Sequence, residues 1–304
     1  MKTFITKCLF FILLLLCAFC ILELRLKQIP NSFNKKKTIF ENQVKDIKIL
    51  ILGSSSALYG INPKYFSEKG FNFANVAQPV YFDVALTTKY FDNLKNLKII
   101  IYDVPYLILW YPGDDWRKYC YYYFWNIKAN DQKWYDINNY SLTLIYTTDT
   151  VIQLTKNNFI LYNEIDLNNN GYSYEMRNKP YKDNGKSVAF RHDELRDSSC
   201  FLRNKSMLEK FAIECKRRNI KLLFTVSPVD SSYTNNITSN ICKKNESLIK
   251  GLCSKYGCLY RNYSQDKRFT RNDFTDAIHM NKNGAQKFST ILNEELIKPI
   301  LDSI

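Results

Sequence analysis

Histidine is scarce in this chain, since only His192 and His279 occur among its 304 residues. Outside the N-terminal apolar segment there is no Cys-x-x-Cys pair and no cluster of cysteine with histidine. The sequence therefore predicts neither a metal site nor a metal cofactor, and we expect no other cofactor. A hydroxyl nucleophile needs a base near neutral pKa, and histidine, present here only twice, is the usual choice.

A nucleic-acid-binding motif and a basic helix are also lacking, although the net charge is +14. The basic residues are scattered along a chain that is rich in Lys, Asn, Ile and Tyr together, so a general compositional bias explains the charge. An anionic glycan or lipid surface remains compatible with it. We expect no nucleic acid among the partners.

One long apolar run is present, from Cys8 to Leu22. With the apolar residues on either side it makes a helix long enough to cross a hydrocarbon core of about 30 Å. A cleaved signal peptide needs small residues before the cut, whereas bulky Phe19 stands there. Residues 1–26 are therefore predicted to be an uncleaved transmembrane signal anchor.

The residues after the anchor suggest an exported domain. Lysines lie on both sides of the apolar run, so charge does not decide the orientation; an N-terminal anchor usually exports the remainder of its chain, and we expect a single-pass protein with an extracytoplasmic domain. Residues 27–46 are polar, contain Pro30 and are predicted to be a stalk. Six cysteines lie outside the anchor, which permits disulfides of unassigned pairing.

Residues 47–304 alternate short β-branched runs with helical patterns, which predicts a three-layer, flavodoxin-like α/β domain with a parallel sheet. Sites in such sheets lie beyond the carboxyl ends of the strands. Ser55 follows one predicted strand, and Asp103 lies at the end of another. The predicted strands are 47–52, 71–76, 97–104, 220–226 and 259–263. The predicted helices are 81–96, 204–219, 240–256 and one that begins near Asn281.

The alternation breaks between about residues 106 and 200, where all four tryptophans fall. We predict an aromatic-rich, mainly helical insertion there. Its aromatic side chains suit a stacking platform for sugars, a surface at the membrane interface or, for most of them, a small core of the insertion itself.

Three residues suggest a nucleophile with its base and acid. Asp276 and His279 are separated by two residues, so the carboxylate can orient the imidazole and stabilise its protonated form. Ser55 follows the first strand, where a sharp turn exposes a hydroxyl, and nearby backbone N–H groups can stabilise an anion. Each residue also has a structural interpretation: Ser55 and Asp276 can cap turns, and His279 can be packed.

The segments ILILGSSSALYG and DAIHMNKNGAQKF resemble the first and last blocks of the SGNH (GDSL-like) hydrolase family. The resemblance covers roughly residues 47–104 and 203–292 and leaves the aromatic insertion outside. It implies that Ser55 is the nucleophile, His279 the base and Asp276 the orienting acid.

Two other blocks depart from the family pattern. The second, normally N-x-G-x-x-G, keeps Asn72 but has alanine in place of both glycines; Ala77 can still donate its N–H to an oxyanion. The third normally supplies an asparagine, whereas this strand ends at Asp103. Asn75 or Gln78 are candidate replacements for the missing donor, whose loss typically costs about 2.7–4 kcal/mol of transition-state stabilisation.

A single anchor, GSS in place of GDS and a late DxxH together resemble bacterial surface-polymer proteins of this superfamily. The resemblance implies serine-dependent O-acyl transfer, with acetyl as the expected group, or ester hydrolysis on a cell-envelope polysaccharide. The expected partners are a cell-surface glycan or glycolipid and an integral membrane acyl-donor protein. The alternative is an inactive SGNH-like module that binds glycan or acts as a scaffold. His192 and Asp103 are weaker candidates for substrate binding: the sequence favours a loop residue for His192 and a turn acceptor for Asp103.

Overall fold

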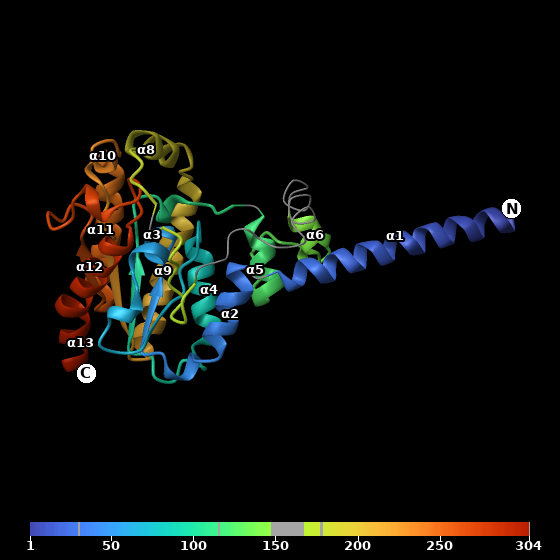
Figure 1. Cartoon of the computed structure of the whole chain (residues 1–304). Coiled ribbons are helices and arrows are strands. Elements are labelled where there is room, and N and C mark those ends of the chain that lie inside the picture. The colour runs from blue at the N-terminus through green and yellow to red at the C-terminus, as the bar shows by residue number, and fades with distance from the viewer. Residues whose placement is uncertain (30, 115, 147–166, 177–178, 304) are drawn as a thin grey trace. The chain divides into compact units, whose positions relative to one another are not determined.

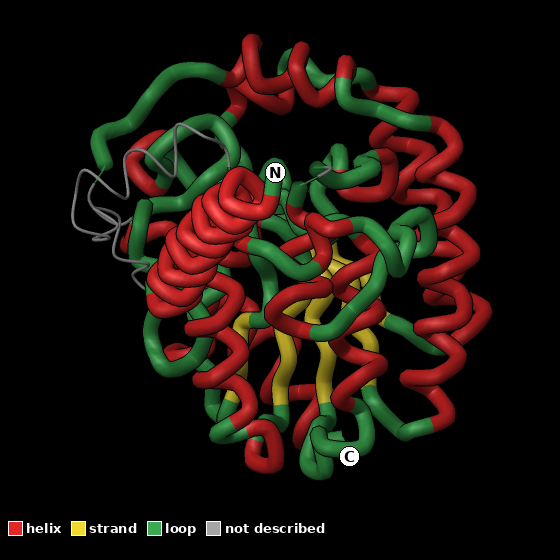
Figure 2. The backbone as a smooth tube through the Cα atoms, turned by 90° about the vertical axis from the view of Figure 1, so that its right-hand side faces the viewer, coloured by secondary structure: helices red, strands yellow, loops and turns green. Residues whose placement is uncertain are grey.

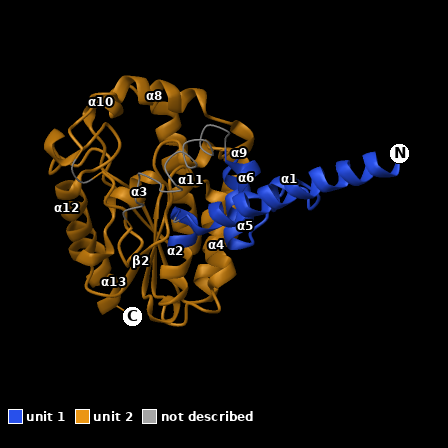
Figure 3. Ribbon diagram, turned by 45° about the vertical axis from the view of Figure 1, so that its right-hand side comes forward, with its two compact units in different colours: residues 1–35, 115–165 blue, residues 36–114, 166–304 orange. Residues whose placement is uncertain are grey.

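The computed structural model describes residues 1–29, 31–114, 116–146, 167–176 and 179–303. The chain divides into two compact units, and each is described by itself. Unit 1 consists of residues 1–35 and 115–165, and unit 2 of residues 36–114 and 166–304 (Figure 3).

Unit 2 is built around a five-stranded parallel sheet in the order β2-β1-β3-β4-β5. Its central strands β1 and β3 are buried along their whole length, because their residues are almost all Ile and Leu and both faces are covered. The strands are β1 (Ile49–Leu52), β2 (Gly70–Asn72), β3 (Ile99–Asp103), β4 (Lys221–Val226) and β5 (Leu259–Asn262).

Helices lie on both sides of this sheet (Figure 2), which confirms the predicted three-layer α/β fold. Helix α9 packs against α4 and α11, and α12 packs against α3. The helices are α2 (Ser32–Glu41, which begins in unit 1), α3 (Ser55–Gly60), α4 (Val80–Tyr90), α8 (Gly185–Glu194), α9 (Ser198–Arg217), α10 (Ser231–Thr234), α11 (Ser239–Tyr256), α12 (Lys282–Leu292) and α13 (Lys298–Asp302). Short turns of helix complete the unit: η1 (Val44–Asp46), η2 (Pro63–Tyr65), η3 (Ile108–Trp110), η5 (Arg271–Asp273) and the π-helical η6 (Asn293–Ile297).

Strand β2 ends earlier than predicted, at Asn72 instead of residue 76. The Asn72 side chain donates to the carbonyls of Ala57 and Ile61, at 2.8 and 2.7 Å, and accepts from the Ala74 N–H at 3.1 Å. These bonds turn the chain out of the sheet and tie it to the segment that follows β1. Asn72 therefore shapes a loop beside the strand ends.

The prediction of a stalk at residues 27–46 is wrong for the second half of that segment. Within unit 2, Phe40 is fully buried, with its ring stacked 4.4 Å from that of Phe73 and edge-on to Tyr90 at 5.0 Å. Lys36 is also buried, only 2% exposed. The segment is polar on average, but one face of α2 and the following turn carries apolar residues that belong to the α/β core.

Unit 1 combines the N-terminal helix with part of the predicted insertion. Helix α1 (Lys2–Gln28) is long and apolar enough to cross a membrane. It is joined by α5 (Arg117–Trp125), η4 (Ile137–Asn139) and α6 (Leu142–Ile145), and Figure 1 shows α6 beside α1. Phe33 packs edge-on against Tyr121 at 5.1 Å and stacks on Phe124 at 6.0 Å, which makes a small aromatic core.

The predicted insertion at residues 106–200 therefore does not form a single compact unit, because residues 106–114 and 166–200 belong to unit 2. There Trp110 stacks on Phe201 at 4.2 Å and donates its indole N–H to Asn245 at 2.7 Å. The part of the insertion at residues 147–166 lies outside the described residues.

Candidate active site

Ser55, His279 and Asp276 form a continuous hydrogen-bonded chain, although 224 positions separate the first two in sequence. Ser55 Oγ lies 2.8 Å from His279 Nε2, and His279 Nδ1 lies 2.8 Å from Asp276 Oδ2. With the carboxylate accepting the Nδ1 proton, Nε2 is free to accept the hydroxyl proton of Ser55. All three residues are partly exposed, so the hydroxyl is accessible from solvent.

Ser55 owes its position to the turn between β1 and α3. Gly53 has φ +135°, a conformation that side chains rarely adopt, and a Cβ there would lie 3.0 Å from the carbonyl oxygen of Asp103. The glycine lets the chain leave the buried strand sharply, and Ser55 becomes the first residue of α3. The side chain of Ser56 points inward and donates to Asp103 at 2.6 Å.

The loop that carries Asp276 and His279 is closed at its base. The Asn281 N–H donates to the Asp273 carbonyl at 3.0 Å, and the Thr275 N–H donates to that of His279 at 2.9 Å. Gly284 faces this base, where a Cβ would lie 2.1 Å from the Asp273 carbonyl oxygen, so only glycine fits. The loop thus returns on itself within nine residues and presents both functional side chains together.

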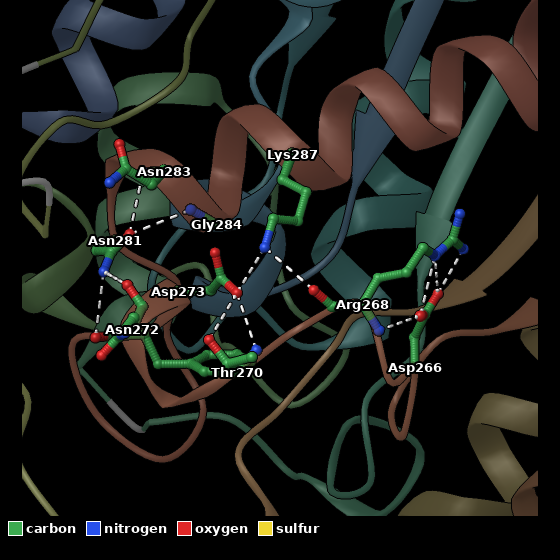
Figure 4. Close-up of polar contacts among 10 residues, drawn as sticks. Asp266, Arg268, Thr270, Asn272, Asp273, Asn281, Asn283, Gly284 and Lys287 are labelled. Carbon is green, nitrogen blue, oxygen red and sulfur yellow. Dashed lines mark hydrogen bonds and ion pairs between the residues drawn. The ribbon is translucent and has the colours of Figure 1, made fainter.

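Side chains around the loop strengthen this closure (Figure 4). Asn281 caps α12 by accepting from the N–H groups of Asn283 and Gly284 at 3.0 and 3.1 Å. Asp273 and Thr270 form a capping box, and Lys287 reaches Asp273 at 2.7 Å. The sequence predicted Asn281 as an N-cap, and this is confirmed.

The electrostatics of Asp276 suit an ionised partner for histidine. Burial opposes ionisation, but the hydrogen bond and charge of His279, with the backbone N–H groups of Ile278 and His279 at 3.0 and 2.9 Å, outweigh it. The pKa of Asp276 is therefore below its usual value. A carboxylate that stays charged can hold the imidazole and stabilise its protonated form.

Tyr59 borders His279, and the second histidine, His192, contacts Tyr233. The Tyr59 ring lies edge-on to that of His279 at 5.3 Å, and its hydroxyl donates to Glu175 at 2.9 Å. Sequence reasoning missed Tyr59, but it stands four residues after Ser55 and so shares a face of α3 with it. His192 bonds through Nδ1 to the Tyr233 hydroxyl at 2.7 Å. Burial, and secondly the nearby His279, lower the pKa of His192 to about 4, so it is neutral at pH 7.

Two predicted binding residues have other partners. Asp103 is fully buried and accepts from the Ser56 hydroxyl and from the Ser227 N–H at 2.8 Å. Burial raises its pKa to about 6. Asp103 therefore joins the loops after β1, β3 and β4, and the interpretation as a turn acceptor fits better than a pocket-lining role. Gln78 is the other predicted replacement for the missing oxyanion donor. Its side-chain amide instead donates to the Asp83 carboxyl at 2.5 Å and to the Phe73 carbonyl at 3.3 Å.

The other two residues of the second block lie in a turn after β2. The Gln78 N–H donates to the Asn75 carbonyl at 3.2 Å, which closes the turn, and the Asn75 side chain accepts from the Val76 N–H at 2.9 Å. Ala77 has φ +50°. This left-handed conformation is one that glycine adopts readily and alanine rarely.

Sequence reasoning also missed a buried pair of ionisable side chains beneath these loops. Asp83 is fully buried and accepts from the Gly53 N–H and the Tyr102 hydroxyl, both at 3.0 Å, and from Gln78. Lys36 donates to the Ala74 carbonyl and interacts electrostatically with Asp83. Burial raises the pKa of Asp83 to about 8 and lowers that of Lys36 to about 7. A Lys-Lys-Lys run does not reveal which lysine is buried.

Within the described residues no group of three or more His, Cys, Asp and Glu side chains is arranged to hold a metal ion. The nine cysteines are free thiols.

Comparison with known proteins gives structural matches alone. No family model matches the sequence, and no curated protein matches it. A predicted acylhydrolase from Bacteroides fragilis is similar, with 10% identity, a TM-score of 0.42, and 89% of this chain and 99% of that chain covered. A GDSL-like lipase from Bacteroides thetaiotaomicron has 12% identity and a TM-score of 0.40, with 90% and 100% covered.

Proposed function

We propose that the chain is a membrane-anchored, serine-dependent acyltransferase or esterase of the SGNH type that acts on O-acyl groups of a cell-envelope polysaccharide. The observation that carries this proposal is the unbroken chain from Ser55 Oγ through His279 to Asp276, with 2.8 Å at each step. A capped turn or a packed histidine does not require this alignment.

The reaction proceeds in two balanced steps. Ser55 Oγ attacks the carbonyl carbon of an acyl ester while its proton moves to His279 Nε2. The bond to the leaving alcohol breaks, that alcohol takes the proton from His279, and the acyl group remains as an ester on Ser55. A glycan hydroxyl or water then attacks this ester and gives its proton to His279, which returns it to Ser55 Oγ. With the glycan hydroxyl the outcome is transfer, and with water it is hydrolysis.

The developing oxyanion needs hydrogen-bond donors. The backbone N–H of Ala77 is not used in a hydrogen bond within the described part of the chain, which suits it to this role. An asparagine in the position of Asp103 is lacking, and Gln78 is committed to Asp83. We infer an oxyanion site that includes the backbone N–H of Ala77, and the side-chain amide of Asn75, whose oxygen accepts from the Val76 N–H, is the remaining side-chain candidate. Acetyl is the preferred acyl group, and an integral membrane protein is the proposed donor.

The second candidate is a glycan-binding or scaffolding module without catalysis. The observation that favours it is the carboxylate of Asp103 at the position where the family pattern has an amide, fully buried and held by Ser56 and Ser227. A carboxylate cannot replace the donor that this position otherwise supplies.

Labelling with a serine-reactive fluorophosphonate separates the two candidates. The full chain in detergent micelles should be labelled, and Ser55→Ala and His279→Ala should each abolish the label. Ser54→Ala is the matched control, because Ser54 is the neighbouring, similarly exposed serine. Labelled Ser55→Ala protein would place the reactive serine elsewhere. An unlabelled but folded wild type would favour the binding module.

For the enzyme, the acyl chemistry can then be followed directly. Incubation with a chromogenic acetyl ester, with and without an oligosaccharide acceptor, measures hydrolysis and transfer separately. Acetylated oligosaccharide that forms with wild type and Ser54→Ala but not with Ser55→Ala would support the proposal for polysaccharide. Hydrolysis that is unaffected by any acceptor would limit the activity to esterase.

A further inference from the structure

The end of the apolar run in α1 is fixed to a second segment of unit 1. Glu23 is the first charged residue after that run, and its carboxylate accepts from the N–H groups of Leu142 and Thr143 at 2.7 and 3.1 Å. It also accepts from the hydroxyls of Ser141 and Thr143 at 3.0 and 2.9 Å. These four bonds hold the beginning of α6 level with the end of the apolar run.

The segment held in this way exposes large apolar side chains. Trp134 is 71% exposed, Ile137 65% and Tyr140 54%, although Leu142 beside them is fully buried. Tyr135 and Leu144 are exposed as well. We call these five side chains the aromatic rim: Trp134, Tyr135, Ile137, Tyr140 and Leu144.

The three aromatic members of the rim are connected to one another. The Tyr140 hydroxyl donates to the Trp134 carbonyl at 2.7 Å, and the rings of Trp134 and Tyr135 meet edge-on at 5.7 Å. Tyr140 also packs edge-on against Tyr122 at 5.7 Å. The rim is thus an ordered surface, and an exposed apolar patch of this kind usually marks an interaction site.

We propose that the aromatic rim lies in the headgroup region of the lipid bilayer that α1 enters. The argument for lipid is continuity: the bonds to Glu23 place α6, next to the rim, where the lipid-exposed run of α1 ends. Tryptophan and tyrosine favour that region because their rings are apolar and their N–H and O–H groups remain hydrated. Arg25 and Lys27, both exposed in the last turn of α1, add cations that suit anionic headgroups.

This contact would give unit 1 a second attachment to the membrane beside the spanning helix. A helix alone is free to rotate about its axis and to tilt, whereas a helix with interfacial aromatic residues on one side is held in one orientation. The rim therefore sets which side of unit 1 faces the bilayer. The proposal depends on α1 lying in the membrane and does not depend on the activity of Ser55.

Tryptophan fluorescence tests the position of the rim. The full chain is reconstituted into vesicles of phosphatidylcholine and phosphatidylglycerol with or without brominated acyl chains, which quench nearby indoles. We expect quenching in the wild type, and Trp134→Phe should remove more than half of it. Trp110→Phe is the control, because Trp110 is buried against Phe201 in unit 2.

Equal quenching in wild type and Trp134→Phe would overturn the proposal, and so would the absence of quenching in the wild type. Co-sedimentation of every variant with the vesicles verifies that α1 has inserted. Protein that remains in the supernatant also overturns it, since the rim is placed by α1. Because Trp134 is exposed, its replacement should leave the thermal unfolding temperature unchanged, and this shows that each variant is folded.

Discussion

Asp276 and Asp83 are two carboxyl groups beside the same serine loop, and they occupy opposite environments. Asp276 is partly exposed, bonds to His279 and has a lowered pKa. Asp83 is fully buried, accepts from Gly53 two residues before Ser55, and has a pKa raised to about 8. Asp276 bonds to His279 and Asp83 bonds to Gly53, and each of these two partners helps to position Ser55. Only the surroundings of Asp276 favour the charged carboxylate.

The difference separates two tasks. An ionised carboxylate next to an imidazole stabilises positive charge that develops during a reaction. A buried carboxyl that accepts three hydrogen bonds determines the shape of the loops, and its charge is unfavourable there. Substitutions at Asp276 should therefore change the rate with little effect on folding, and substitutions around Asp83 should do the reverse.

The largest expected effect is on catalysis, from Asp276→Asn. An amide keeps the shape but cannot hold His279 in the same tautomer or stabilise its charged form, so kcat should fall by about 10⁴-fold. The measurement is hydrolysis of a chromogenic acetyl ester, with thermal unfolding in parallel. If kcat falls less than tenfold while the unfolding temperature drops strongly, Asp276 is a structural cap and the contrast with Asp83 fails.

The second effect is on stability, from Lys36→Met. This change leaves the buried Ala74 carbonyl without its donor and removes the amine that lies near Asp83, and we expect the free energy of unfolding to fall by about 1–3 kcal/mol. Chemical denaturation of the full chain in detergent measures it. Lys37→Met, on the same helix with a side chain 35% exposed, is the matched control and should change little.

The double variant Lys36→Met/Asp83→Asn sharpens this result. If the two groups act as a pair, it should be more stable than the sum of the two single changes predicts, by about 0.5–3 kcal/mol. Strict additivity would show that the two groups are buried independently of each other.

The third effect is a pH dependence of stability. The pKa of Asp83 is about 8 in the folded chain and 3.8 is its ordinary value, so the folded state retains a proton that the unfolded state loses as the pH rises above 3.8. The contribution of Asp83 to stability is therefore fully present below 3.8 and is lost as the pH rises through 8. The amide in the Asp83→Asn variant does not titrate; the stability of wild type minus that of this variant should fall by up to about 3 kcal/mol between roughly pH 4.5 and 7.

Denaturation curves at several pH values check this slope. For Asp276→Asn we expect the opposite pH dependence of the stability difference from wild type. The pKa of Asp276 is lowered in the folded chain, so its contribution to stability is present above its ordinary pKa and is lost in acid. A difference between wild type and Asp83→Asn that is independent of pH would mean that Asp83 is already ionised in the folded chain.

The local sequence predicts the role of Asp276 and the elements around it, but it does not predict the burial of Asp83. The runs that became β1, β3 and β4 are apolar over most of their length, and a buried parallel strand is the simplest structure for such a run. Asn281 is an N-cap by residue type, and the cap is observed. These features depend on near neighbours in the chain, which a single sequence contains.

The burial of Lys36 and Asp83 depends on distant partners. Lys36 contacts a carbonyl 38 positions away, and nothing in its charged neighbourhood sets it apart from Lys35 or Lys37. The place of Gln78 next to the second block predicts an oxyanion donor, whereas its side chain donates to Asp83, which no local pattern indicates. A buried polar group can be found from sequence only when its partner is known, because burial without one is unfavourable.

The smallest expected effect concerns Ala77, which lies between the two regions. Its φ of +50° is unfavourable for alanine by about 1 kcal/mol and is allowed for glycine, so Ala77→Gly should relieve strain while it increases the freedom of the unfolded chain. We expect a net stabilisation below about 1 kcal/mol and unchanged ester hydrolysis, because the N–H group is kept. Ala77→Pro removes that N–H and requires a negative φ. If Ala77→Pro is folded and as active as wild type, the oxyanion site does not use this group, and its donors come from the serine loop or from Asn75.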